Sequence, residues 1–338
     1  MKKPHILQIY PMNHPDGEKV LNELAQVKKL VAYDESEIVN YLQNHQVDGI
    51  ILRAPARITK TILDNCQGVK AISGAGVGLD NIEVEYATKK GIPILHAPKI
   101  NSQATAEHAV GLLLAVLKKL TFFDRETRKG NSAIRNGNYT FELHGKTVGI
   151  VGFGTIAQIT AKILAHGFGM KAVAYVRSIT DDKKKIADQY GIELTTSLEE
   201  IFIESDAVSL HLPLTQETDK MIDYSLFKLM KKTAVLINTA RGGIVNEEDL
   251  ARALREQLFL GAGIDVFAKE PPPKDHPFFQ LENVVTSPHV AGLSYEAASK
   301  SSMTIAENII KVIKGEQISG IANKQVFIKE LKCNFLTV

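Results

Sequence analysis

Residues 146–177 read KTVGIVGFGTIAQITAKILAHGFGMKAVAYVR and carry the strongest indication of the fold of this chain. Its first apolar run predicts a buried parallel strand, and Gly152, Gly154 and Ala157 follow in the spacing G-x-G-x-x-A at the start of a helical pattern. Such glycines allow a tight turn and let backbone N–H groups approach a pyrophosphate, while a small third residue lets the helix pack closely on the strand. The stretch therefore predicts a dinucleotide-binding β-α-β unit with a second strand over 172–176.

The end of that second strand carries no carboxylate. A site that prefers NAD places Asp or Glu there, on the ribose hydroxyls, whereas this sequence has Val176, Arg177 and Ser178. A guanidinium can form a forked, charge-assisted pair with a 2′-phosphate, which a carboxylate would repel. We therefore expect NADP in preference to NAD. NAD stays open, because Arg177 is also explained as a solvated loop residue.

Composition narrows the class of protein. A chain of 338 residues, 44% of them hydrophobic, is long enough for two domains and a large core. The formal net charge of +2, with scattered Lys and Arg, gives no reason to expect a nucleic-acid partner. Two cysteines, Cys66 and Cys333, offer neither a disulfide framework nor a metal-ligand spacing, and no apolar stretch of about 18 residues could cross a membrane. We expect a cytoplasmic protein without a metal.

Before residue 100, short apolar strands alternate with amphipathic helices, which predicts a second parallel sheet. The glycine-rich loop 73–78 ends one of these strands, and Arg53 and Arg57 follow another. The loop's three glycines expose backbone N–H groups suited to a carboxylate or phosphate, although a tight turn with positive φ explains them as well. The expected strands are 6–9, 49–52, 71–73 and 94–99, with a helix around 18–24.

A long helical pattern begins at residue 101 and runs to about 128, and its apolar excess suits a subunit interface. We predict an α/β fold of two doubly wound parallel-sheet domains. A Rossmann dinucleotide-binding domain, 101–292, is inserted into a discontinuous flavodoxin-like substrate domain, 1–100 and 293–338. After the glycine loop the expected strands are 207–210, 234–238, 261–266 and 284–286, and a helix is expected over 295–312.

Three polar residues stand at successive strand ends of the dinucleotide domain: Arg241, Glu270 and His289. Hydride transfer to a carbonyl needs a proton donor on the oxygen and a cation on the adjoining carboxylate, and a neighbouring carboxylate would raise the pKa of the imidazole. Each residue alone has a structural explanation, as a cap or ion-pair residue, a turn residue before Pro271, or a strand-end residue. Their recurrence beside one nucleotide loop favours a catalytic function.

The segments NTARGG (238–243), DVFAKEP (265–271) and SPHVAG (287–292) resemble the three signature stretches of the D-isomer-specific 2-hydroxyacid dehydrogenase family. GKTVGIVGFG (145–154) and HLPLT (211–215) match that family as well. The resemblance implies reversible hydride transfer between NAD(P)H and a small 2-keto acid. A short form of D-3-phosphoglycerate dehydrogenase and a glyoxylate or hydroxypyruvate reductase are the two leading possibilities.

The resemblance also implies roles for individual residues. Arg241 would hold the carboxylate and carbonyl of the substrate, His289 would give or take the proton, and Glu270 would pair with His289. Val77 and Gly78 would bind the substrate carboxylate through their backbone, and Arg53 the rest of the substrate. The implied cofactor-binding residues are Thr105, Gly152, Gly154, Thr155, Ile156, Val176, Arg177, Ser178, His211, Pro213, Thr218, Thr239 and Asp265, the last at the nicotinamide carboxamide.

The sequence allows more than one substrate and more than one function. Arg53 and Arg57 could meet a substrate phosphate, whereas Arg177 favours the NADP-dependent reductases. Thr155 stands where the family commonly has a basic residue. A dinucleotide-sensing scaffold without catalysis, like the corepressors that share this fold, is the alternative function. We expect a homodimer, and no appended regulatory domain after residue 338.

Overall fold

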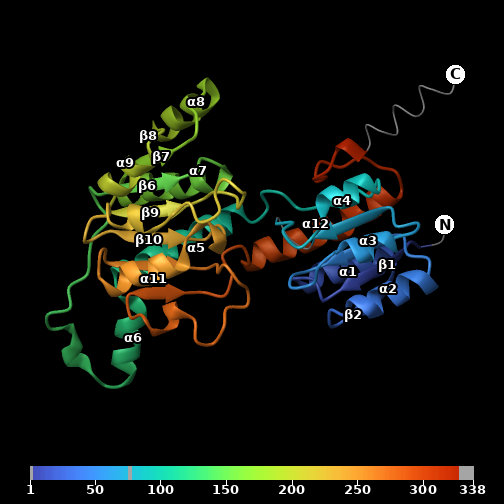
Figure 1. Cartoon of the computed structure of the whole chain (residues 1–338), viewed down its shortest axis with the longest axis horizontal. Coiled ribbons are helices and arrows are strands. Elements are labelled where there is room, and N and C mark those ends of the chain that lie inside the picture. The colour runs from blue at the N-terminus through green and yellow to red at the C-terminus, as the bar shows by residue number, and fades with distance from the viewer. Residues whose placement is uncertain (1–2, 75–77, 327–338) are drawn as a thin grey trace. The chain divides into compact units, whose positions relative to one another are not determined.

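The computed structural model describes residues 3–74 and 78–326. The chain divides into two units, each built on its own parallel sheet (Figure 1). Unit 1 consists of Met1–Asn101 and Leu293–Val338, and unit 2 of Ser102–Gly292. Among the described residues, no helix combines the length and the apolar character that a membrane crossing requires.

The sheet of unit 1 has the strand order β2-β1-β3-β4-β5, the doubly wound order of flavodoxin-like domains. Apolar side chains from both faces of this sheet form two buried clusters under the helices. The strands are β1 His5–Ile9, β2 Gln26–Leu30, β3 Gly49–Leu52, β4 Ala71–Gly74 and β5 Ile94–Leu95. The helices are α1 Pro15–Leu24, α2 Glu35–Asn44, α3 Lys60–Asp64, α4 Val84–Lys89 and α12 Tyr295–Ile313.

Two expectations for unit 1 were wrong. Strand β2 was not expected, because its sequence QVKKL is polar and mostly exposed, as suits a strand at the edge of the sheet. The strand expected over 94–99 is only Ile94–Leu95. It is short because the chain then turns to the segment after α12, where the N–H of His96 donates to the carbonyl of Gly320 over 3.0 Å.

The sheet of unit 2 has the order β12-β11-β10-β9-β6-β7-β8, with the glycine-loop strand β6 inside the sheet between β9 and β7, which is a Rossmann arrangement. The predicted fold class, two doubly wound parallel sheets, is confirmed. Strand β8 was not expected, because its sequence IELT is short and half polar. The strands are β6 Thr147–Val151, β7 Lys171–Tyr175, β8 Ile192–Thr195, β9 Ala207–Leu210, β10 Val235–Asn238, β11 Gly261–Ile264 and β12 Val284–Thr286.

The helical pattern expected as one element over 101–128 is two helices, α5 Ser102–Leu117 and α6 Leu120–Arg128. They are separated because Lys119 adopts a left-handed conformation, with φ of 49°, which ends α5. Helix α5 packs on the sheet with nine buried residues, whereas α6 has none and extends away from the sheet (Figure 1). The apolar pattern therefore described a core helix followed by a projecting one.

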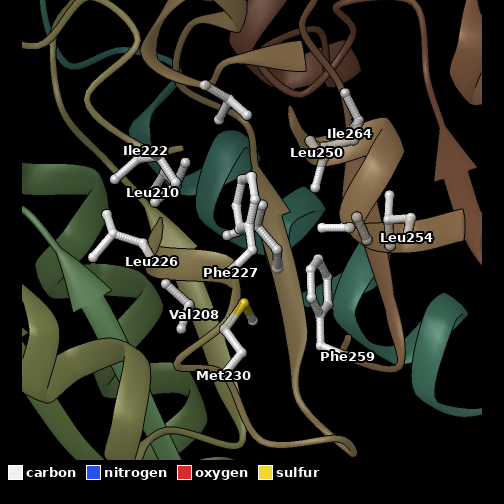
Figure 2. Close-up of a cluster of buried hydrophobic side chains, with 14 of the residues drawn as sticks. Val208, Leu210, Ile222, Leu226, Phe227, Met230, Leu250, Leu254, Phe259 and Ile264 are labelled. Carbon is white, nitrogen blue, oxygen red and sulfur yellow. The ribbon is translucent and has the colours of Figure 1, made fainter. Parts of the chain in front are cut away.

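Several of the other helical elements of unit 2 contribute side chains to a large apolar cluster, part of which Figure 2 shows. Phe227 and Phe259, both fully buried, lie near the centre of this cluster with ring centroids 5.8 Å apart. The α-helices are α7 Thr155–Lys162, α8 Asp181–Tyr190, α9 Leu198–Glu204, α10 Tyr224–Phe227 and α11 Glu247–Arg255. The 3-10 helices are η1 Ser132–Arg135, η3 Gly242–Ile244 and η4 Pro277–Gln280, and η2 Ile163–Gly167 is a π-helix.

Candidate active site

The three residues expected to carry catalysis follow three neighbouring strands of unit 2. Strands β10, β11 and β12 are parallel, and their last residues, Asn238, Ile264 and Thr286, lie side by side in register. The loops that follow therefore emerge from the same edge of the sheet, the edge at which open α/β sheets bind ligands. Arg241 lies in the first of these loops, Glu270 in the second and His289 in the third.

His289 and Glu270 form a hydrogen-bonded pair. Nδ1 of His289 lies 2.7 Å from Oε2 of Glu270, and Oε1 of Glu270 accepts from the N–H of Phe267 over 3.0 Å. Because an ionised carboxylate only accepts, Nδ1 is the donor, and Nε2 is left to face a substrate. The pairing expected from the sequence is present in the structure.

The pair shifts the pKa values of both partners. The hydrogen bond to Glu270 and its charge raise the pKa of His289, against burial and the charge of Arg241, which lower it. Burial opposes ionisation of Glu270, but the hydrogen bonds from His289 and Phe267 and the charges of His289 and Arg241 outweigh it, so the pKa of Glu270 is lowered. The imidazole therefore keeps its proton to higher pH than an isolated histidine does.

Arg241 is held beside this pair by its own loop. The Asn238 side chain accepts from the N–H of Ala240 and donates to the carbonyl of Arg241, each over 3.0 Å. A Cβ added to Gly242 would lie 1.9 Å from the backbone of Phe267, so glycine lets the loops of Arg241 and Glu270 pack directly against each other. The positive charge of Arg241 lowers the pKa of Glu270 and also lowers the pKa of His289, so the guanidinium interacts electrostatically with both residues of the pair.

The backbone of His289 is held in an uncommon conformation. Its φ is 55°, a left-handed value that few non-glycine residues adopt. The N–H of His289 donates to the carbonyl of Asp265 over 2.7 Å, and the Asp265 carboxylate accepts from the N–H groups of Val290 and Ala291, each over 2.9 Å. Asp265, at the end of β11, thus shapes the loop that carries His289.

The glycine loop between β6 and α7 has the geometry of a phosphate site. Gly152 has φ of 105°, and a Cβ there would lie 2.6 Å from the carbonyl oxygen of His211, so only glycine fits. At Gly154 a Cβ would meet no described atom within 4 Å, so this side of the loop is open. Helix α7 begins at Thr155 without a side-chain cap, which leaves its first N–H groups available to an anion.

Comparison with known proteins agrees with this geometry. Residues 110–291 match the family model described as "D-isomer specific 2-hydroxyacid dehydrogenase, NAD binding domain". The chain belongs to this family. It is an oxidoreductase of the D-2-hydroxyacid dehydrogenase type, as its resemblance predicted.

Three relatives illustrate the likeness of this D-2-hydroxyacid dehydrogenase. A glyoxylate reductase of Thermococcus litoralis is 39% identical over 287 residues, which are 83% of this chain and 85% of that protein. A D-3-phosphoglycerate dehydrogenase of Methanocaldococcus jannaschii is 35% identical over 92% of this chain, but the chain spans only 58% of that protein. An acyclic imino acid reductase solved with NADPH and D-Arg has a TM-score of 0.81 at 30% identity, with 94% of this chain and 99% of that chain covered.

A nicotinamide dinucleotide is the cofactor of this dehydrogenase, and the residues beside the glycine loop fit it. Thr239, directly after β10, has a buried hydroxyl with no hydrogen-bond partner among the described residues. A buried polar atom without a partner is unfavourable unless a ligand satisfies it. Together with the open side at Gly154 and the uncapped start of α7, where Thr155 and half-buried Ile156 lie, it provides donors and space for a dinucleotide.

The three cofactor residues expected in the loop after β7 differ from one another in solvent exposure. Val176 is buried, whereas Arg177 and Ser178 are exposed. Nη1 of Arg177 lies 2.6 Å from Oε2 of Glu217, in the loop after β9, and both side chains are more than 70% exposed. The guanidinium of Arg177 is thus paired with a carboxylate 40 positions further along the chain, a contact that sequence spacing did not indicate.

The remaining expected cofactor residues lie in three places. Thr105 is buried on α5. Nε2 of His211 lies 2.9 Å from the Ser209 hydroxyl, and burial lowers the pKa of His211 to about 4, so this imidazole is neutral. The hydroxyl of Thr218 donates to the carbonyl of Pro213 over 2.7 Å and thereby closes the turn after β9.

Asp265, which is expected to contact the nicotinamide carboxamide, makes its hydrogen bonds in the structure to the protein itself. Its side chain is fully buried, and its two carboxylate oxygens accept hydrogen bonds from the protein itself. Burial opposes its ionisation, but hydrogen bonds from His108, Ser287 and two backbone N–H groups outweigh it and lower its pKa. The expected contact with the carboxamide remains a prediction.

The substrate-binding residues expected in unit 1 are only partly described. Val77 lies outside the described residues, and Gly78 is exposed. Arg53 follows β3, with its N–H donating to the carbonyl of Ile9 over 3.3 Å, and its Nε is buried without a hydrogen-bond partner among the described residues. Such a donor suits an anionic or polar ligand group, in line with the expectation for Arg53.

Sequence reasoning missed two residues that contact the site. His108 on α5 and Ser287 after β12 are joined by a 2.9 Å contact from Nε2 to Oγ. Ser287 lies in the SPHVAG motif, whose resemblance implied no role for this residue. His108 lies three residues after Thr105, on the same face of the helix, and that spacing was the one signal that could have pointed to it.

Proposed function

We propose that this D-2-hydroxyacid dehydrogenase reduces a small 2-keto acid, of the glyoxylate or hydroxypyruvate type, with NADPH as the preferred reductant. The single observation that carries the proposal is the His289–Glu270 pair, 2.7 Å from Nδ1 to Oε2, at a strand edge shared with Arg241. A cation and a protonated imidazole at one edge are what the reduction of a keto acid requires.

In this proposal each side chain has one task. The bound dinucleotide supplies the hydride to the substrate carbon. Nε2 of His289 gives its proton to the carbonyl oxygen as that oxygen gains negative charge, and in the oxidative direction it takes the proton back. Glu270 stabilises the imidazolium and holds it in the required orientation. Arg241 binds the substrate carboxylate and orients the carbonyl, as a planar guanidinium can do with two parallel hydrogen bonds.

The preference for NADPH rests on Arg177. A guanidinium at the end of β7, 80% exposed, can pair with a 2′-phosphate, and the imino acid reductase of similar structure was solved with NADPH. Glu217 competes with the phosphate for this guanidinium. Because an exposed ion pair is worth at most about 1 kcal/mol, a doubly charged phosphate can displace it.

The proposed substrate is a short keto acid because several relatives that match the chain over most of their own length are named glyoxylate reductase. A phosphorylated substrate of the 3-phosphoglycerate type is the second candidate. It is favoured by the buried, unpartnered Nε of Arg53, with Arg57 exposed four residues later, and by the relatives named D-3-phosphoglycerate dehydrogenase.

We also propose a homodimer that forms through α6 and the segment after it. No residue of α6 is buried, and two large apolar side chains are exposed, that of Leu120 at the start of α6 by 53% and that of Tyr139 in the segment after it by 81%. Exposed apolar side chains on a projecting element are typical of an interface with another chain.

A cytoplasmic location is also proposed. It is supported by the small number of cysteines in the chain, two, and by the buried free thiol of Cys66.

Turnover tests the proposal directly. Purified protein is mixed with NADPH or NADH and a panel of glyoxylate, hydroxypyruvate and phosphohydroxypyruvate, and the absorbance of the reduced cofactor is followed. We expect oxidation of NADPH with glyoxylate or hydroxypyruvate, and a His289→Ala variant should lose on the order of 100-fold in kcat. Cofactor binding without turnover of any keto acid would favour the non-catalytic scaffold instead.

A further inference from the structure

We propose that His108, on helix α5, is a positioning residue for catalysis, which acts through Ser287 and Asp265 to hold the loop of His289 in its working conformation. The inference rests on the proposed role of His289 as the proton donor, and it assigns a task to His108 and Ser287 that the proposed function does not need by itself.

The four residues form one chain of contacts. Nε2 of His108 lies 2.9 Å from Oγ of Ser287, and Oγ of Ser287 donates to Oδ1 of Asp265 over 2.5 Å. The same Nε2 lies 3.5 Å from Oδ1 of Asp265. Asp265 in turn holds the His289 loop with both its carbonyl and its carboxylate.

The direction of these hydrogen bonds follows from the buried carboxylate. Asp265 is fully buried and its pKa is lowered, because hydrogen bonds from His108, Ser287 and the backbone outweigh the effect of burial. An ionised carboxylate only accepts, so the one hydroxyl hydrogen of Ser287 goes to Asp265. The oxygen of Ser287 must then accept from His108, whose Nε2 therefore carries a hydrogen.

This chain stabilises a conformation that the loop would not favour alone. A left-handed non-glycine residue such as His289, with φ of 55°, is strained and persists only where its surroundings impose it. Asp265 imposes it by accepting from three consecutive N–H groups, those of His289, Val290 and Ala291. Without the donors from Ser287 and His108, the buried carboxylate would be only partly satisfied and would shift toward other partners.

The contact between His108 and Ser287 links two parts of unit 2 that are distant in sequence. It joins α5 to the loop after β12 across 179 positions of sequence, and its side chain is 28% exposed. Thr105, expected to contact the cofactor, lies one turn earlier on the same helix. The helix that carries an expected cofactor residue is therefore tied by hydrogen bonds to the loop that carries the proton donor.

The test compares His108→Leu, which has no donor, with His108→Gln, whose amide N–H can reach a position similar to Nε2. We expect kcat of His108→Leu to fall roughly 10- to 100-fold, as small misplacements of a catalytic group do, with the Kd for NADPH changed less than twofold. We expect His108→Gln to recover most of the loss. Gln103→Ala, at an exposed position of α5, serves as the control and should match the wild type.

Ser287→Ala and the double variant with His108→Leu complete the experiment. If both residues act through one chain, the double variant should be no slower than the slower single variant, a non-additive result. Unchanged kcat in both His108→Leu and Ser287→Ala, while His289→Ala is inactive, would overturn this inference alone. Full activity of His289→Ala would overturn the catalytic role of His289 and this inference with it.

A fall in melting temperature without a fall in kcat would also overturn the inference, because it would show a structural role only. Should His108→Leu fail to fold, His108→Gln and Ser287→Ala still decide: a kcat loss in Ser287→Ala at unchanged Kd supports the chain, and wild-type kcat rejects it.

Discussion

Nδ1 of His289 donates to the carboxylate of Glu270 over 2.7 Å, and that one contact sets both the orientation of the imidazole and the pH range in which it is protonated. The second oxygen of Glu270 is bound to the backbone of Phe267, so the carboxylate cannot rotate away freely. The dyad is therefore built to present a charged imidazole whose Nε2 is free for the substrate.

Glu270→Gln should lower the pKa of His289, because it removes the negative charge that raises it. Reduction needs protonated His289, so its activity is present below the pKa of His289 and is lost as pH rises through that value. The alkaline limb of the kcat profile should move to lower pH in Glu270→Gln, with kcat on that limb reduced on the order of 10-fold. For oxidation, which needs neutral His289, the acid limb should move to lower pH. Profiles identical to the wild type in both directions would contradict the role of Glu270.

Arg177→Ala should weaken NADPH binding by on the order of 10-fold and leave NADH binding nearly unchanged, since only NADPH carries the 2′-phosphate. Glu217→Gln should have the opposite effect on NADPH, by up to about fivefold, because it removes a competitor whose ion pair contributes at most about 1 kcal/mol. Cofactor Kd values from fluorescence titration measure both effects. Equal changes for the two cofactors would show that this pair does not select between them.

Gly152→Ala should mainly lower the stability of the protein, whereas Gly154→Ala should mainly lower its affinity for the dinucleotide. At Gly152 the added Cβ would lie 2.6 Å from the His211 carbonyl in a backbone with φ of 105°, so we expect a loss of about 2 kcal/mol or more in the free energy of unfolding. At Gly154 the Cβ meets open space, so stability should be nearly unchanged while the Kd for the dinucleotide rises. Urea unfolding and cofactor titration measure the two properties. Unaltered dinucleotide affinity in Gly154→Ala would contradict the placement of the pyrophosphate at this loop.

His211 should make the protein sensitive to mild acid. Burial lowers the pKa of His211 to about 4, whereas an unfolded histidine titrates near 6.5. Between these values only the unfolded state takes up the proton, so stability should be lost as pH falls from about 6.5 to about 4, by on the order of 3 kcal/mol. His211→Gln should flatten this slope, while His166→Gln, at an exposed position, should not. Urea unfolding curves at several pH values test this, and equal slopes in the wild type and His211→Gln would refute it.

The two parallel sheets, the glycine turn and the three strand ends that carry Arg241, Glu270 and His289 could be predicted from the sequence alone. These features follow from local patterns, because apolar runs, glycine spacing and strand-helix alternation depend on neighbours along the chain. The parallel register of β10, β11 and β12 then places their ends at one edge without any further information.

Other features became visible only in the folded chain: the edge strands β2 and β8, the break at Lys119, the Arg177–Glu217 pair, and the contacts of His108 and Ser287 with Asp265. Edge strands keep polar sequences because half of their surface is exposed, so their apolar signal is weak. The left-handed backbone of His289 and the buried charge of Asp265 are imposed by partners distant in sequence, and no local pattern encodes which distant groups will meet.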